Sequence, residues 1–149
     1  MFSKILLPID VAEPEAAKKA IDVATNMAAT HKASPRLVHV TSPIVVAAPM
    51  VVIPQSVYEA LSLARKAELD RLAATIDWPP GTVSTTVRVG GIYPELLAEA
   101  EEWGADLIVV RAHKLSMATY LLGSTAAAIV RHANCAVMVV RDDKKASLL

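Results

Sequence analysis

Residues 106–141 read DLIVVRAHKLSMATYLLGSTAAAIVRHANCAVMVVR, and the pattern of this stretch decides the fold class. It opens with an apolar run, Asp106–Arg111, which is typical of a strand covered on both faces of its sheet. A Gly-Ser-Thr sequence at 123–125 then precedes an expected helix over Ala126–His132, and Ala136–Val140 forms another apolar strand. A strand, a helix and a second strand in this order predict a parallel β-α-β unit.

The rest of the chain alternates strands and helices in the same way. Strands are expected at Ile5–Ile9, Arg36–Val40 and Thr82–Val89. Three helices are expected in this part of the chain. The first carries Glu13 and Glu15 in its first turn and an apolar stripe of Ala17, Ala20, Ile21, Ala24 and Ala28. The second covers Val57–Ile76 with a stripe of Leu61, Ala64, Leu69, Leu72 and Ile76, and the third runs from Pro94 to Gly104. Five strands with intervening helices predict an α/β fold: a doubly wound five-stranded parallel sheet with helices on both faces. We expect one domain over residues 1–141 and a charged C-terminal tail over 142–149.

Composition excludes several classes of protein. The 15 basic and 15 acidic residues give zero net charge, which argues against a nucleic-acid binder with a broad basic field. The longest apolar stretch, Ile44–Ile53, is too short to span a membrane and contains Pro49. The N-terminus shows no signal peptide, and the single Cys135 cannot form an internal disulfide, which favours a reducing compartment. We therefore expect a cytoplasmic protein that does not span a membrane.

Ligands of doubly wound sheets bind beyond the carboxyl ends of the strands, so the residues that follow each strand are the candidates for a site. Asp10 ends the first strand, where its carboxylate can accept ribose hydroxyls or can serve as a helix cap or Asx-turn. The sequence 123–125 opens a helix, where it can bind a phosphate or simply cap the helix beside a basic loop. His39 lies in an apolar strand, a position that favours a core histidine over a ligand.

Signatures of catalysis are missing from the sequence. It contains no G-x-x-x-x-G-K-[ST] loop, no G-x-G-x-x-G after the first strand and no G-x-S-x-G elbow. The histidines have no metal-ligand spacing, and Cys135 has no CxxC companion. We therefore assign no catalytic residues and no metal site.

Three segments resemble the universal stress protein family: KILLPID at 4–10, LVHV at 37–40 and the whole of 106–141. The run TYLLGS at 119–124 is similar to the branch that contains the bacterial universal stress proteins F and G. The resemblance covers essentially the whole chain. It implies strand order 3-2-1-4-5, ATP as the bound ligand with Mg²⁺ as its companion ion, and dimers that form through the last strands.

The family's nucleotide-binding pattern is G-x2-G-x9-G-[ST]. Here Arg111 and Lys114 stand at the first two glycines, the following loop is one residue shorter, and Gly123-Ser124 is kept. Lys114 can replace a backbone contact to phosphate with a charged one. The resemblance implies contacts to adenine and ribose from Pro8, Ile9, Asp10 and Val40, and contacts to the phosphates from Val110, Arg111, His113, Lys114, Gly123, Ser124 and Thr125.

These observations favour a cytoplasmic ATP-binding regulatory module that changes partner or assembly state when nucleotide binds. The alternatives are an interaction protein without nucleotide and a slow ATPase. In the family's strand order the apolar strand Ala136–Val140 lies at the sheet edge, so we expect a homodimer through Val137, Met138, Val139 and Val140. The apolar loop Ile44–Ile53 offers a second interface, for a tetramer or for an unidentified protein partner.

Overall fold

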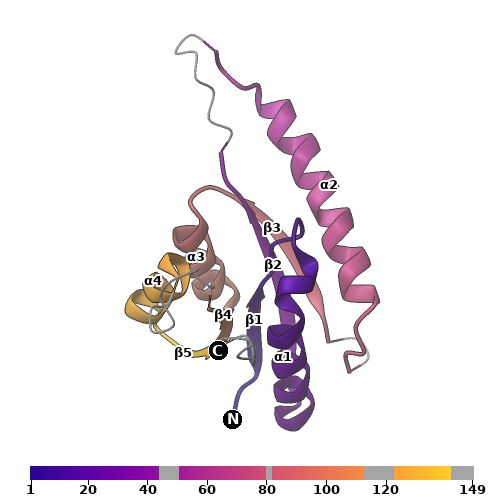
Figure 1. Cartoon of the computed structure of the whole chain (residues 1–149), viewed down its shortest axis with the longest axis vertical. Coiled ribbons are helices and arrows are strands. Elements are labelled where there is room, and N and C mark those ends of the chain that lie inside the picture. The colour runs from indigo at the N-terminus through magenta and orange to yellow at the C-terminus, as the bar shows by residue number, and fades with distance from the viewer. Residues whose placement is uncertain (44–50, 80–81, 113–122, 142–149) are drawn as a thin grey trace, which may run out of the picture.

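The computed structural model describes residues 1–43, 51–79, 82–112 and 123–141. Five parallel strands form one sheet in the order β3-β2-β1-β4-β5, as predicted (Figure 1). The strands are β1 (Lys4–Pro8), β2 (Ser34–Thr41), β3 (Ser84–Val89), β4 (Leu107–Arg111) and β5 (Ala136–Val140). Because all five strands are parallel, their carboxyl ends lie along one edge of the sheet.

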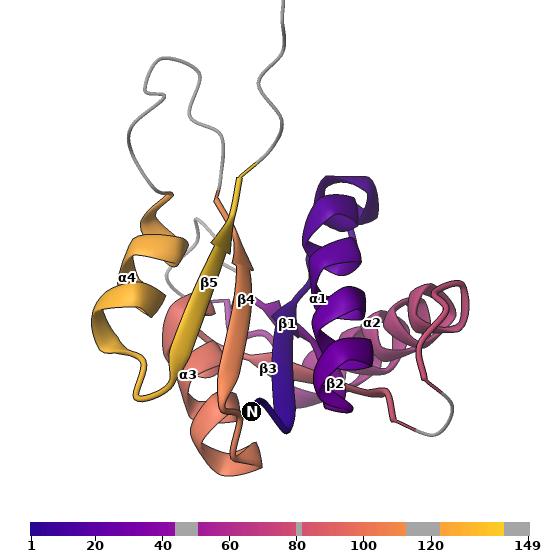
Figure 2. The same cartoon turned by 90° about the horizontal axis from the view of Figure 1, so that it is seen from below.

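Helices cover both faces of the sheet. They are η1, a 3-10 turn (Pro14–Ala17), and the α-helices α1 (Lys18–His31), α2 (Gln55–Ala74), α3 (Ile92–Trp103) and α4 (Ser124–His132). Figure 2 shows α1 and α2 on one side of the sheet, with α3 and α4 on the other. The core is accordingly split: Ile5 and Leu7 of β1 pack with α1, while Leu6 between them packs with α3 and α4. This alternation follows from the two-residue period of a strand.

The start of α1 differs from the prediction. The sequence placed Glu13 and Glu15 in the first turn of an α-helix, whereas α1 begins only at Lys18. Glu15 lies in the tighter turn η1, and Glu13 precedes that turn. Pro14 at the first position of η1 fits a helical start without an N–H donor, and short 3-10 turns are common at such starts. The predicted apolar stripe of Ala20, Ile21, Ala24 and Ala28 is buried as expected.

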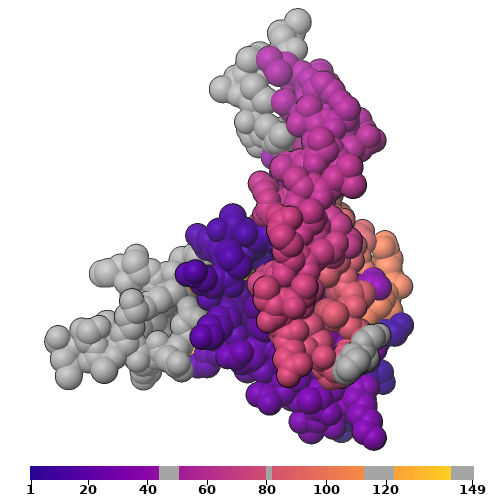
Figure 3. Space-filling view, turned by 90° about the vertical axis from the view of Figure 1, so that its right-hand side faces the viewer, coloured from indigo at the N-terminus to yellow at the C-terminus, as the bar shows by residue number. Residues whose placement is uncertain are grey.

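Helix α2 extends well beyond the sheet (Figures 1 and 3). Only Leu69 and Ala73 of its 20 residues are buried, and both lie in its C-terminal part. The predicted buried stripe is therefore wrong at Ala64, which is exposed. Helical periodicity identifies a face of the helix, but it does not indicate where the sheet beneath that face ends.

Charged side chains join α3 to β2 and β3. Glu99 is buried, and its carboxylate pairs with Arg36 at 3.1 Å and with Arg88 at 3.3 Å. Arg88 also pairs with Glu102 and Glu95, each at 2.9 Å. The pKa of Arg88 is raised, chiefly by its hydrogen bond to Glu102 and further by those to Glu95 and Glu99. These pairs fix α3 against the sheet. The helix stops at Gly104, as the sequence predicts, and Gly104 adopts the left-handed conformation (φ 82°) that is common at the ends of helices.

The amino ends of β1 and β4 are closed by hydrogen bonds. The Asp106 carboxylate accepts from the backbone N–H of Ser3 at 2.8 Å and from that of Lys4 at 3.0 Å. The Lys4 ammonium donates to the Trp103 carbonyl at 3.0 Å, and the Arg36 guanidinium lies 4.5 Å from the centre of the Trp103 ring. At this end of the sheet, each of these polar groups has a partner within the chain.

Candidate functional site

A cleft of about 690 Å³ lies at the carboxyl ends of the strands. Its walls come from the ends of β1, β2 and β4, from the turn that leads into η1, and from the first residues of α3 and α4. The sheet topology explains this position. The crossover that follows β1 runs through α1 on one face, the crossover that follows the neighbouring strand β4 runs through α4 on the other face (Figure 2), and a crevice remains between them.

The structure brings the predicted residues together around this cleft. The predicted residues that line it are Pro8, Ile9, Asp10, Val40, Val110, Arg111, Ser124 and Thr125. Gly123 does not line it; this residue is buried directly before Ser124 and caps α4. His113 and Lys114 lie outside the described residues. Their contacts with a ligand, like those of the lining residues, stay predictions.

Asp10 sits on the turn between β1 and η1. Its Oδ1 accepts a hydrogen bond from the backbone N–H of Ala12 at 3.0 Å, and its carbonyl accepts one from Glu13 at 3.1 Å. This is the Asx-turn that the sequence allowed. The side chain is exposed at the cleft, and among the described residues its Oδ2 accepts no hydrogen bond. One carboxylate oxygen therefore shapes the turn while the other remains available to a ligand.

The end of β2 contributes two polar residues that the predicted nucleotide contacts do not include. His39 and Thr41 are each 8% exposed, and both line the cleft. The Thr41 hydroxyl has no hydrogen-bond partner within the described part of the chain. The prediction of a core histidine is right about the burial of His39 but misses its position beside the cleft. The sequence could have indicated this position, because residues 39 and 41 share one face of a strand that ends at the expected site.

The part of the cleft that β4 and α4 form is suited to negative charge. Arg111 ends β4 and is half-buried, while Ser124 and Thr125 form the first turn of α4. The N-terminus of α4 presents backbone N–H groups and the positive end of the helix dipole to this wall. The cleft is thus lined by a cation and a helix N-terminus from β4 and α4 and by the Asp10 carboxylate from the turn after β1. Glu13 and Arg65 line it as well, so charges of both signs surround it.

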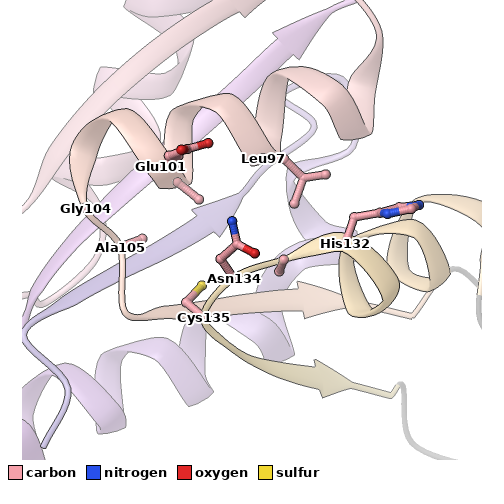
Figure 4. A pocket seen from close by; sticks show the side chains of 9 residues that line it. Leu97, Glu101, Gly104, Ala105, His132, Asn134 and Cys135 are labelled. Carbon is pink, nitrogen blue, oxygen red and sulfur yellow. The ribbon is translucent and has the colours of Figure 1, made fainter.

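Another, smaller pocket lies away from the carboxyl ends of the strands (Figure 4). It has a volume of about 210 Å³ between the end of α3 and the turn that leads into β5. Cys135 lies here, and burial raises the pKa of its thiol, with Asp106 adding to the effect. A raised pKa keeps the sulfur protonated, which opposes a role as nucleophile. Among the described residues, no group of three His, Cys, Asp or Glu side chains could hold a metal ion.

The fold and the cleft define a class: single-sheet parallel α/β proteins with a polar crevice at the topological switch point. Within that class, the family model of the Universal stress protein family matches residues 1–141. The chain therefore belongs to the universal stress protein family, as its sequence predicted. Within residues 1–43, 51–79, 82–112 and 123–141, none of the helices combines the length and hydrophobicity that a membrane span needs.

Two universal stress proteins illustrate the similarity of the chain to its relatives. Universal stress protein G of Salmonella typhimurium is 30% identical over 146 residues, which cover 95% of this chain and 100% of that protein. The match to universal stress protein G of Shigella flexneri is 45% identical over 67 residues, so it spans about half of each protein, 45% of this chain and 46% of the relative.

The two structures are of universal stress proteins in complex with nucleotides. One, in complex with cAMP, has a TM-score of 0.61 and 24% identity, and the match covers 93% of this chain and 96% of that one. The other, from Archaeoglobus fulgidus in complex with dAMP, has a TM-score of 0.55 and 15% identity, over 92% of this chain and 96% of that one. At these identities the likeness establishes the fold.

Proposed function

We propose that this protein binds ATP in the cleft at the carboxyl ends of the strands. The observation that carries the proposal is the polarity of the cleft, with Asp10 on one wall and Arg111 and the start of α4 on another. Ribose hydroxyls suit the carboxylate, and phosphates suit the helix N-terminus and the cation. The universal stress proteins in complex with cAMP and dAMP support an adenine nucleotide as the ligand class.

The dimensions and chemistry of the cleft fit such a ligand. Its volume of about 690 Å³ lies within the range of roughly 300–1,000 Å³ that is usual for small-molecule sites. Ile9 and Val110 supply apolar wall for the base and sugar, and we assign the adenine contact to the backbone of Val40. In this proposal Mg²⁺ is carried by the ATP phosphates. The protein then acts as a nucleotide-dependent regulatory module of the cytoplasm.

Nucleotide binding can be tested by identifying the small molecules that the protein releases when it unfolds. Protein purified without added nucleotide is denatured, and the released small molecules are identified by mass. We expect an adenine nucleotide, at a level that falls in Asp10→Ala and stays unchanged in Asp22→Ala, an exposed acid on α1. Absence of any nucleotide, together with no binding of added ATP, would favour an interaction protein without nucleotide. Release of phosphate from ATP above the blank would favour the slow ATPase.

We further propose that two copies of the chain assemble through β5. This strand is the last of the sheet, its sequence is AVMVV, and Val137, Met138 and Val139 are only half-buried. An apolar edge strand promotes pairing with another chain, and two identical edges can pair about a two-fold axis. β3, at the other edge, is polar in sequence (STTVRV) and lacks this character. A tetramer through the 44–53 loop stays a prediction, because residues 44–50 lie outside the described chain.

Sedimentation at micromolar concentration tests the dimer. We expect a dimer for the wild type and a monomer for Val139→Pro, because proline removes a ladder donor. Ala136→Lys is the milder second variant, since it adds a charge at the exposed start of β5 without removing an N–H group. Circular dichroism reports whether each variant keeps its fold. A wild-type monomer, or folded variants that remain dimeric, would contradict assembly through β5.

A further inference from the structure

The His39 ring lies against the turn that carries Asp10. His39 Nδ1 is 3.0 Å from the Ile9 carbonyl oxygen and 3.4 Å from the Val11 backbone nitrogen. Ile9 and Val11 are the two chain neighbours of Asp10. The imidazole of β2 therefore touches the backbone on both sides of the carboxylate that we assign to the ribose.

The two contacts of Nδ1 require opposite roles, because the Ile9 carbonyl needs a donor whereas the Val11 N–H needs an acceptor. The contact with Ile9 is shorter and favours the hydrogen on Nδ1, in which case the 3.4 Å approach of Val11 is not a hydrogen bond. A carbonyl oxygen only accepts, so a separation of 3.0 Å from Ile9 requires Nδ1 to donate. With the hydrogen on Nε2 instead, the lone pair of Nδ1 would face those of the Ile9 oxygen, which is repulsive. Ile9 also donates its own N–H to the Val38 carbonyl at 2.8 Å. Both backbone polar groups of Ile9 are thus bonded to β2.

The other hydrogen bonds of Asp10 are local. Among the residues that the structure describes, its side chain reaches only Ala12 and its carbonyl reaches only Glu13, so neither bond ties the turn to the sheet. The tie across the sheet comes from β2, through the bond of Ile9 with Val38 and the bond of His39 with Ile9. Because His39 is 8% exposed, its ring is confined by packing and can hold this geometry.

We propose that His39 is a positioning residue for nucleotide binding: through Nδ1–H it holds the Ile9 carbonyl and thereby places the Asp10 carboxylate at the cleft. This inference rests on the proposed ATP site and adds a residue to it. His39 acts through Asp10, and its loss removes part of what Asp10 contributes to binding. A histidine that served only the core would support the fold without this coupling.

The test compares two replacements that differ at the position of Nδ1. The amide nitrogen of His39→Asn stands where Nδ1 stood and can still donate to Ile9, whereas His39→Leu fills the space without a donor. ATP affinity is measured by calorimetry, and stability by urea unfolding. We expect His39→Leu to weaken binding roughly fivefold to tenfold, the value of one lost hydrogen bond. We expect His39→Asn to bind within about twofold of the wild type.

A double-mutant cycle separates positioning from packing. In an Asp10→Ala background, we expect His39→Leu to change ATP affinity by less than about twofold, because residues that act as one unit have non-additive effects. Equal weakening in both backgrounds, or wild-type affinity in His39→Leu, would overturn the positioning role. If His39→Leu fails to fold, His39→Gln replaces it; its donor lies one bond farther out, so we expect weaker binding than for His39→Asn, and equal binding would overturn the role.

The outcome also distinguishes this inference from the function on which it rests. If the wild type binds no ATP, the proposed function fails and the role of His39 fails with it. If the wild type binds ATP and Asp10→Ala weakens binding while His39→Leu does not, only the role of His39 fails. Amide hydrogen exchange at Ala12 and Glu13 adds a readout without ligand, and we expect it to be faster in His39→Leu than in the wild type.

Discussion

The two ends of the sheet differ in how their polar groups are satisfied. At the amino end, Asp106 accepts two backbone N–H groups, and Lys4 donates to Trp103. At the carboxyl end, the Thr41 hydroxyl is buried without a partner in the described chain, and Asp10 uses one oxygen of its carboxylate. Buried polar groups in folded proteins are normally paired, so an unpaired one needs an explanation. Under the proposed function, the contacts at the amino end serve stability and the polar groups at the carboxyl end serve the nucleotide. Trp78 Nε1, between α2 and β3, is also buried without a partner in the described chain, but it does not line the cleft.

The comparison predicts two separable kinds of variant. Changes in the contacts at the amino end of the sheet and at Glu99 lower the free energy of unfolding and leave nucleotide affinity unchanged. Changes in the cleft lower nucleotide affinity and leave stability nearly unchanged.

The largest effect is expected at Glu99, which joins Arg36 of β2 to Arg88 of β3. Glu99→Ala leaves both guanidinium groups without a buried carboxylate. We expect a loss of about 3 kcal/mol in the free energy of unfolding, the low end for a broken buried pair, because Arg88 keeps Glu95 and Glu102. Urea unfolding measures this loss. Glu101→Ala, an exposed acid on the same helix, is the control, and equal losses in the two variants would contradict a structural role for Glu99.

The next effect separates the two ends of the sheet with one type of substitution. Asp10→Ala is expected to weaken ATP binding tenfold to a hundredfold, since a lost hydrogen bond to a charged group is worth roughly 1.5–3 kcal/mol. Asp106→Ala removes a carboxylate from the opposite end, so it should lower stability and preserve affinity. Calorimetry measures the ATP affinity of each variant, and urea unfolding measures its free energy of unfolding. A similar loss of ATP affinity in both variants would contradict the separate roles of the two ends of the sheet.

The smallest effect is expected at Asp70, which accepts hydrogen bonds from Thr85 of β3 and from Lys66. The Thr85 hydrogen bond is the main cause of the lowered pKa of Asp70, and Lys66 adds to it. Because the pKa is lower in the folded than in the unfolded state, the stabilisation exists above about pH 4 and is lost as the pH falls through the folded value.

Asp70 is half exposed, so screening keeps this contribution to about 0.5 kcal/mol. Thr85→Val should therefore be slightly less stable than the wild type at pH 7, and the gap should be smaller at about pH 3, below the unfolded value. Thermal unfolding at both pH values measures the gap. A gap that stays the same across this range would mean that Asp70 is not its cause.

The sequence predicted the elements and the edge of the sheet that carries the site. Apolar runs such as Asp106–Arg111 identified the strands, and the parallel topology placed Asp10 and Ser124 at one end. Two features could not be read from local patterns. The Glu99 network joins residues 63 and 11 positions apart in the chain, and the contact of His39 with Ile9 depends on the register of β2 against β1. Such contacts arise only when the strands are aligned.

A calorimetric titration of nucleotide-free wild-type protein with ATP tests directly whether the cleft binds this nucleotide. We predict saturable binding of one ATP per chain. We predict weaker binding of adenosine, which lacks the phosphates that the start of α4 and Arg111 would contact. A dissociation constant of about 1 mM corresponds to a binding free energy of about −4 kcal/mol. The absence of saturable heat at ATP concentrations up to about 1 mM would contradict the proposed ATP site.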